Sequence, residues 1–365
     1  MEQEEEISAL ANRLIELENQ RIEIAQILKK QNSIISDNEF ASFDFLENNI
    51  EKKVDYSLFE GNLVAIDGSI LAEELTSLDL LLYRSVAVEF SYEKGKLIDH
   101  HYYPSAINRP SMWYGHSMQS HEFNWAKNLK RLNSEITCAI EAAKKFQPKI
   151  VLLDGSIVPQ VSDRPSVDSN TYVLYEELLG NLNKLYEYVD ENQIILAGVI
   201  KDSRGRHFIN LIKKYFSNLS LNQRNALESS NDTSFLYNLL EPGFRTGAFK
   251  YASSASEEVV LKDLGNYSKR IASFYLRAVE MDRPLRVDFL LPKDSNDQSI
   301  ELIAKSIYSL SRNNREYGYP AALIEADLRA VLQIEEMDFA YNRLFTKTGL
   351  KADVFKLRKN TRPFR

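Results

Sequence analysis

The tripeptide Asp-Gly-Ser occurs twice in this chain, each time directly after a run of apolar residues, Val64–Ile66 and Val151–Leu153. A buried strand that ends on a carboxylate can hold a divalent cation over a scissile phosphate. Two such strands side by side would offer Asp67 and Asp154 to the same ion. Asp-Gly is also a common turn pair, so turn chemistry explains either copy alone. The repeat with matching apolar lead-ins favours a functional pair.

Two further carboxylates are candidates for the same site. Glu135 lies roughly 40° beyond Ala139, at the edge of the apolar stripe of a helix predicted over 117–146. From that edge it could reach the strand ends, although a solvated surface glutamate is the alternative interpretation. Glu89, near the end of another predicted strand, competes for this role. Asp327, near the start of the last predicted helix, is the candidate for a fourth ligand.

Lys201 is predicted at the end of a buried strand, where a helix begins close by. There it could hold a phosphate or position the attacking water, and the partial positive charge of a helix N-terminus would assist. Asp202 or Ser203 is expected to be the N-cap of that helix.

Arg204, Tyr275 and Arg277 are the candidate DNA contacts. Tyr275 and Arg277 lie two residues apart, on one face of a predicted strand. Arginine suits bidentate contact with phosphate, and tyrosine suits a polar or stacking contact with nucleic acid. A structural tyrosine beside an exposed arginine explains the same pair equally well.

Histidine and cysteine give no metal signature. The five histidines lack a paired ligand spacing and are predicted to be structural. The single cysteine, Cys138, excludes an intrachain disulfide and a cysteine-based zinc site.

The composition is that of a globular protein, with 365 residues, 44% hydrophobic and 27% charged. The length suggests one elaborated domain or two. An acidic N-terminus and the lack of a long apolar run predict a cytoplasmic protein. The net charge of −7 means that nucleic acid would have to meet a local basic surface. No P-loop and no G-x-G-x-x-G motif is present, so hydrolysis of ATP or dinucleotide binding is not expected.

Residues 5–32 form a predicted long helix with apolar residues at heptad spacing. Such a seam needs a partner, and a second copy of the chain or the domain body could each supply it. We therefore expect an N-terminal helical segment over 1–58, resembling half of a coiled coil.

The next elements are predicted in the order strand, strand, strand, helix, strand, helix, strand, helix. Their approximate ranges are 62–67, 78–90, 96–103, 117–146, 149–154, 172–188, 193–200 and a helix from about 203. A three-strand meander followed by right-handed crossovers is the arrangement of the ribonuclease H-like fold. The prediction is an α/β protein with a mixed five-stranded sheet core flanked by helices. The first and fourth strands would be parallel neighbours at its centre, so the two aspartates would meet.

The C-terminal part is predicted to be an α/β extension of the same domain, which spans 59–345. A loop-rich insertion is expected over 218–256, followed by strands at 271–279 and 285–291 and a helix at 299–311. A last helix is predicted to begin with Pro320 as its first residue. A basic tail over 346–365 could contact DNA or a partner, or could simply be a solubilising tail. Its basic residues are Lys356, Arg358, Lys359, Arg362 and Arg365.

Between about residues 60 and 335 the chain resembles the NurA nucleases, DNA end-resection enzymes that work with the HerA hexameric ATPase. The match consists of an ordered set of short motifs, none of which is specific alone. In order they are Ile-Asp-Gly-Ser at Asp67, the helical Glu135, Leu-Asp-Gly-Ser at Asp154, Lys201-Asp202-Ser203, Tyr275-x-Arg277 and Tyr319-Pro320.

The resemblance implies a manganese- or magnesium-dependent 5′-to-3′ exonuclease and endonuclease, with two ions, that forms a homodimer and docks on HerA. Asp67 and Asp154 would be shared metal ligands, with Glu135 and Asp327 as outer ligands and Lys201 as an orienting group. In the family the last helix normally offers a histidine where this chain has Asp327. Aspartate is a harder oxygen ligand that also suits Mg²⁺ or Mn²⁺, so metal preference or rate could differ. The role could be recombination repair or defence against phage.

Two other classes of function stay open from the sequence. One is a catalytically weak or inactive adaptor that docks on a hexameric DNA translocase and regulates it. The other is an actin- or hexokinase-like phosphotransferase, whose related sheet also carries aspartates at strand ends. The lack of glycine-rich phosphate loops counts against the phosphotransferase.

Overall fold

The computed structural model describes residues 2–31, 44–216, 219–252, 259–293, 297–349 and 357. The α-helices are α1 (Glu2–Gln31), α2 (Ser120–Phe146), α3 (Tyr172–Glu191), α4 (His207–Tyr215), α5 (Leu221–Glu228), α6 (Asp232–Leu239), α7 (Val259–Asp263), α8 (Asp297–Leu310), α9 (Ala321–Ala330) and α10 (Ile334–Thr348). Short 3₁₀ helices are η2 (Val161–Asp163) and η3 (Gly265–Arg270). The strands are β1 (Glu51–Lys53), β2 (Gly61–Glu74), β3 (Leu78–Glu93), β4 (Lys96–Tyr103), β5 (Ser111–His116), β6 (Ile150–Asp154), β7 (Ile195–Ile200), β8 (Phe244–Thr246), β9 (Phe249–Lys250), β10 (Ile271–Arg277) and β11 (Leu285–Leu290).

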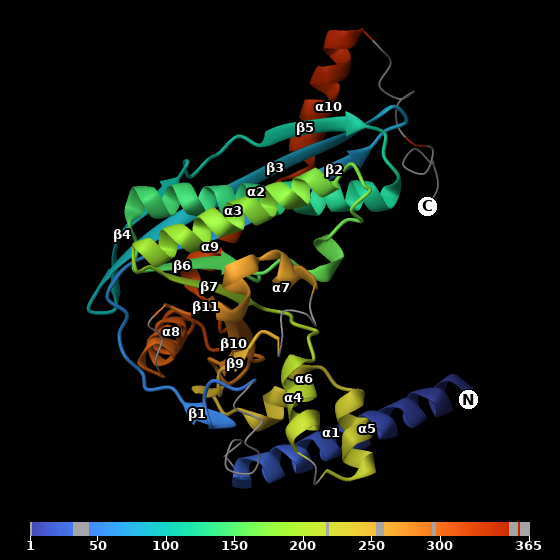
Figure 1. Cartoon of the computed structure of the whole chain (residues 1–365). Coiled ribbons are helices and arrows are strands. Elements are labelled where there is room, and N and C mark those ends of the chain that lie inside the picture. The colour runs from blue at the N-terminus through green and yellow to red at the C-terminus, as the bar shows by residue number, and fades with distance from the viewer. Residues whose placement is uncertain are drawn as a thin grey trace.

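Within the residues that the structure describes, 11 strands form one mixed sheet (Figure 1). Its main order is β1-β8-β10-β11-β7-β6-β2-β3-β4, with β5 paired to β3 and β9 paired to β10. In the five-stranded part β4-β3-β2-β6-β7, the strands β2, β3 and β4 form an antiparallel meander. β6 then pairs parallel to β2, and β7 pairs parallel to β6. This is the predicted ribonuclease H-like core. The antiparallel β11 and β10 continue it on the β7 side, as the α/β extension.

Helices cover both faces of the central strands, as Figure 1 shows for α2 and α3 on one side. Along β2, Val64 and Ile66 pack into the core under α2 and α3. The alternate residues Leu63 and Ala65 pack into the core under α8 and α9. Side chains alternate across a strand, so a strand with apolar residues at every position must be covered on both faces.

Helix α1 packs on the domain body with its C-terminal half only. Ile24 and Leu28 are fully buried in a small core shared with α4, α5 and α6. Ile7, Leu10 and Leu14, from the same heptad pattern, are more than half exposed. The domain body is thus one partner of the heptad seam, and within a single chain the first half of the seam lies uncovered. None of the helices in the described ranges has the length and apolar character needed to cross a bilayer.

The region 218–256 is not the loop-rich insertion that we predicted, because it contains α5, α6, β8 and β9. Several of its polar residues are helix caps, which look like loop residues in a sequence. The Ser220 hydroxyl accepts a hydrogen bond from the Gln223 N–H, and Asn231 accepts one from the Ser234 N–H. Caps of this kind satisfy backbone groups that the first turn leaves open.

Other boundaries also differ from the prediction. A further strand, β5, lies between the predicted strand at 96–103 and the predicted helix at 117–146; it includes Trp113 and pairs with β3. Pro320 is the N-cap of α9 and not its first residue. The last predicted helix is divided into α9 and α10. The basic residues predicted for the tail lie outside the described residues.

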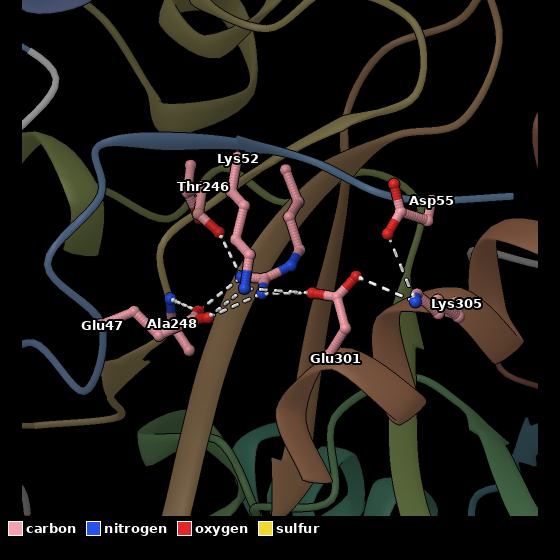
Figure 2. Close-up of polar contacts among 8 residues, drawn as sticks. Glu47, Lys52, Asp55, Thr246, Ala248, Glu301 and Lys305 are labelled. Atoms are coloured by element: carbon pink, nitrogen blue, oxygen red, sulfur yellow. Dashed lines mark hydrogen bonds and ion pairs between the residues drawn. The ribbon is translucent and has the colours of Figure 1, made fainter. Parts of the chain in front are cut away.

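A buried arginine ties the segment before β1 to the far edge of the sheet (Figure 2). The guanidinium of Arg245, on β8, is fully buried and donates to Glu47 at 2.7 Å and to Glu301 at 3.1 Å. The Glu47 carboxylate also accepts a hydrogen bond from the Ala248 N–H at 2.8 Å, and Lys52 pairs with both glutamates. The buried charges are therefore paired. The Arg245 Nε alone of the guanidinium nitrogens has no hydrogen-bond partner among the described residues.

Candidate active site

Asp67 and Asp154 lie on adjacent parallel strands at the centre of the sheet. The ladder between β2 and β6 pairs Leu63 with Ile150 and ends with Ile66 opposite Leu153. The two aspartates are the next residue of each strand, and neighbouring strands lie about 4.8 Å apart. Both side chains project to the face that α9 covers, by alternation. The predicted meeting of the two carboxylates is confirmed.

The first Asp-Gly-Ser is not at a strand end, contrary to the prediction. β2 continues past Asp67 to Glu74, paired with β3 over its whole length. β6 does end at Asp154, and Gly155 follows with a φ of +125°, a conformation that favours glycine. From Asp67 onward β2 has no ladder partner on the β6 side in the described chain, which opens this edge to other side chains.

Glu135 fills part of that opening from α2. A Cβ atom at Gly68 would lie 2.6 Å from the Glu135 Cγ and 2.7 Å from its Oε1. The glycine of the first Asp-Gly-Ser is therefore required for close approach, because any side chain there would displace the glutamate. Glu135 is buried and pairs with Arg131, one helical turn earlier. The prediction that Glu135 reaches the sheet is confirmed, while Arg131 was not predicted.

Burial, together with the charges of neighbouring carboxylates, raises the pKa of Asp67 and of Glu135. Burial, followed by the charges of Asp154 and Glu135, raises the pKa of Asp67 to about 8. Burial raises the pKa of Glu135 to about 7, even though Arg131 acts in the opposite direction. Such shifts indicate an excess of negative charge in a partly dry place. A bound cation would offset this excess of negative charge.

Asp154 is held by two groups on its own face of the sheet. Its Oδ1 accepts a hydrogen bond from the Tyr319 hydroxyl at 2.9 Å, and its Oδ2 pairs with the Lys201 Nζ at 2.9 Å. The same Nζ lies 4.4 Å from the centre of the Tyr319 ring. Burial lowers the pKa of Lys201, but the hydrogen bond and charge of Asp154 outweigh burial and raise it. Lys201 thus carries its charge beside the aspartate. Tyr319, which the sequence indicated only as part of the Tyr319-Pro320 motif, contacts the same carboxylate.

Asp327 lies at the exposed rim of this cluster, on α9. A hydrogen bond with Asp327 is among the causes that raise the pKa of Asp67. The structure therefore brings together all four predicted carboxylates and Lys201.

The serines of the two motifs anchor the neighbouring segments. Ser156 donates to Asp288 on β11 at 2.7 Å and accepts from the Val158 N–H, which fixes the loop after Asp154. Ser69 accepts from the Leu332 N–H at 3.3 Å and holds the junction between α9 and α10. The tripeptides therefore combine a carboxylate with a structural hydroxyl.

Glu89, the competing candidate, lies outside the cluster. It sits opposite Val64, three positions from the pair that Asp67 makes with β3, which is about 10 Å along a strand. Its carboxylate accepts from Ser91 at 2.6 Å and contacts His101 at 3.2 Å. Its partners give it a structural role.

Tyr275 and Arg277 do not face a DNA surface, and this prediction is wrong. Tyr275 is fully buried, and its hydroxyl donates to Asp232 at 2.7 Å. Arg277 is 9% exposed and donates to the backbone carbonyls of Tyr237 and Leu240. α4, α5 and α6 cover this face of β10, which the sequence had suggested was a loop-rich and open region.

The loop after β7 is longer than predicted, since α4 begins at His207 and Arg206 is its N-cap residue. Asp202 and Ser203 are therefore not caps of α4. Asp232 accepts from the N–H groups at the start of α4 instead. Arg204 lies in this loop and is exposed.

The donor set fits a hard divalent cation, although the side chains do not enclose one. In the described part of the chain, no group of three or more Asp, Glu, His or Cys side chains is arranged to hold a metal ion. Asp154 and Glu135 point instead to Lys201 and Arg131. Four carboxylates against two cationic groups leave a negative excess, and carboxylate oxygens are the ligands that Mg²⁺ and Mn²⁺ prefer.

The fold and the site together define a ribonuclease H-like protein with a carboxylate cluster at the junction of its central parallel strands. The model of the NurA domain family matches residues 41–332, and the chain belongs to this family. The predicted resemblance is thereby confirmed.

Solved structures of similar fold cover nearly the whole chain. The NurA nuclease from Sulfolobus solfataricus is 17% identical, with a TM-score of 0.53 over 93% of this chain and 96% of that chain. A NurA structure with manganese is 11% identical, with a TM-score of 0.52 over 96% of this chain and 99% of that one. Among curated proteins no match was found.

Proposed function

We propose that this chain is a divalent-metal-dependent deoxyribonuclease that hydrolyses phosphodiester bonds as a 5′-to-3′ exonuclease and endonuclease. The observation that carries the proposal is the convergence of Asp67, Asp154, Glu135 and Asp327 on one place beside the central strands. Membership of the NurA family supports it, as does the manganese named with one of the similar structures.

In this proposal Asp67 and Asp154 are the shared ligands, and Glu135 and Asp327 complete the set from the two flanking helices. Two bound Mn²⁺ or Mg²⁺ ions would supply activation of water and stabilisation of the leaving oxygen. The lysine at the end of β7 has a separate task. It carries a positive charge beside Asp154 and can bind a nonbridging phosphate oxygen of the DNA.

Tyr319 and Arg131 are positioning residues in the same scheme. The Tyr319 hydroxyl lies 2.9 Å from Asp154 Oδ1 and 3.1 Å from the Val199 carbonyl oxygen, and its single proton is shared between these two acceptors. Arg131 holds Glu135 against the strand across a single helical turn. Rigid support of this kind keeps the carboxylates in place when the repulsion between them would separate them.

The test is incubation of the purified protein with end-labelled DNA and Mn²⁺. We expect cleavage that needs the metal and that Asp67→Ala or Asp154→Ala abolishes, with folding preserved by circular dichroism. Cleavage retained in either variant with added Mn²⁺ would overturn the metal assignment. A chain that does not cleave DNA, alone or with its ATPase, would be the regulatory adaptor instead.

We further propose that the protein forms a homodimer and acts with a HerA-type hexameric ATPase, in DNA end processing or anti-phage defence. Family membership supports this partnership. Light scattering of the purified chain, with and without a co-encoded ATPase, measures both assemblies. A monomer that does not bind the ATPase would contradict the proposal.

A further inference from the structure

A polar cavity of about 750 Å³ lies where four separate segments of the chain meet. α1 lines it with Glu18 and Arg21, and the loop after β7 lines it with Arg204. Tyr237 from α6 and Arg283 from the loop between β10 and β11 also line it, and so does the exposed Asp202, two residues before Arg204. None of these six residues belongs to the carboxylate cluster, although the loop after β7 begins with Lys201, which does.

Two short stretches of chain connect the cavity to that cluster. Arg204 is three residues after Lys201, which pairs with Asp154, and three residues span at most about 11 Å. On the other side, Asp282 accepts a hydrogen bond from the Gly318 N–H at 2.8 Å. Gly318 directly precedes the tyrosine whose hydroxyl binds Asp154. A strand cleaved at the carboxylates could therefore extend into the cavity within a few nucleotides.

The arginines of the cavity differ in whether their charge is already paired. Arg21 pairs with Glu18 at 3.0 Å and donates to Ser230 at 2.7 Å. The guanidinium groups of Arg204 and Arg283 are exposed and have no side-chain partner among the residues that the structure describes. An unpaired guanidinium offers a planar set of donors that matches a phosphate group.

Tyr237 adds an aromatic surface beside these charges. Its side chain is 41% exposed, and the Arg277 guanidinium lies 4.1 Å from the centre of its ring. Arg277 also donates to the backbone carbonyl of Tyr237 at 3.0 Å, which fixes the position of the residue. A ring that is held in place and open to the cavity can stack on a nucleobase at a small entropic cost.

We propose that this cavity binds the part of a DNA strand that flanks the scissile bond. Arg204 and Arg283 hold phosphate groups, Tyr237 stacks on a base, and Arg277 acts as a positioning residue behind Tyr237. The inference rests on the proposed nuclease function and extends it by assigning the flanking nucleotides a place.

The test is binding of a short fluorescent single-stranded oligodeoxynucleotide to the full chain in EDTA, followed by anisotropy over a range of salt concentrations. In the double variant Arg204→Ala/Arg283→Ala we expect the slope of log K against log salt to fall by about 1.4, because each phosphate contact on a single strand adds about 0.7. The matched control is Lys184→Ala/Lys269→Ala, which removes two exposed charges from α3 and η3. An unchanged slope and affinity in the arginine variant, or an equal loss in the control, would overturn the proposal.

The aromatic contact has its own pair of variants. We expect Tyr237→Ala to weaken binding about 5- to 100-fold and Tyr237→Phe to bind like the wild type, since stacking needs the ring and not the hydroxyl. Thermal unfolding confirms that each variant folds. Binding by Tyr237→Ala that equals the wild type would contradict the stacking assignment.

Cleavage with Mn²⁺ is measured beside binding, so that the two proposals fail separately. If the wild type cleaves DNA and the arginine variant both binds and cleaves as well, only the cavity assignment is lost. If the wild type does not cleave, the proposed function is lost, and the binding data still decide the cavity assignment. A wild-type chain that does not bind the oligonucleotide would overturn the cavity assignment directly.

Discussion

Removing one charge from the carboxylate cluster should stabilise the protein without metal and abolish its response to metal. In Asp67→Asn the side chain keeps its size but no longer repels Asp154 and Glu135. At about 5 Å and an effective dielectric constant of about 20, each such repulsion is about 3 kcal/mol. Lys201 and Arg131 offset part of it, so we expect a net gain of about 2–3 kcal/mol. For a cooperative chain of 365 residues this raises Tm by about 3 °C.

The pH dependence of this gain has a defined sign. A carboxyl group whose pKa is raised by folding destabilises the fold increasingly as pH rises from its unfolded pKa to its folded pKa. For Asp67 that window runs from the ordinary value of 3.8 to about 8. The advantage of Asp67→Asn should therefore be about a quarter to a third of its maximum at pH 5 and near its maximum at pH 8.

The assay is thermal unfolding at both pH values, in EDTA and in Mn²⁺. At a hundredfold excess over Kd the metal should stabilise the wild type by about 2.7 kcal/mol, again about 3 °C, and the variant hardly at all. Asp168→Asn makes the same change at an exposed carboxylate. It should leave both the Tm in EDTA and the increase of Tm with Mn²⁺ as they are in the wild type. A Tm of Asp67→Asn below that of the wild type in EDTA at pH 8, or an increase of its Tm with Mn²⁺ as large as that of the wild type, would refute the reasoning.

Gly68→Ala should displace Glu135 and weaken Mn²⁺ binding, measured by calorimetry, about tenfold or more, as is typical when a residue that supports a metal ligand is changed. In the control variant Gly180→Ala the added Cβ meets no atom of the rest of the described chain within 4 Å, so this variant should bind metal normally. Normal binding by Gly68→Ala would contradict the close approach. Arg245→Ala should lower the free energy of unfolding by about 3–5 kcal/mol in denaturant, because two carboxylates lose their buried partner; a loss under 1 kcal/mol would contradict this. Tyr319→Phe should cost about 1 kcal/mol of stability and slow cleavage far less than removal of Asp154; loss of all cleavage would give the hydroxyl a direct role in the reaction.

The sequence predicted the centre of the fold well because the central strands are buried on both faces. Continuous apolar runs ending in Asp67 and Asp154 identified two parallel neighbours, and the pairing of β2 with β6 follows. The extent of β2 beyond Asp67 could not be predicted, since among the described strands its second half pairs with β3 alone and lacks the continuous apolar run of Leu63–Ile66. The opening that admits Glu135 depends on this difference in strand length.

The interpretation of Tyr275 and Arg277 failed for a tertiary reason. The two residues do lie on the same face of β10, as predicted, but the sequence does not show what covers that face. The helices α5 and α6 cover it, and their capping residues, Ser220 and Asn231, are of types that also occur in loops. The Arg277 side chain is itself nearly buried, and the ring that it contacts, that of Tyr237, is exposed.

The central claim is that side chains distant in the sequence share one cation. The most direct measurement is anomalous diffraction from crystals of the protein grown with Mn²⁺. We predict a peak between the Asp67 and Asp154 carboxylates, at about 2.0–2.6 Å from oxygen atoms of each. A manganese-loaded crystal with no peak there, or with the two carboxylates more than about 10 Å apart, would contradict the account, because no single ion could then be bound by both.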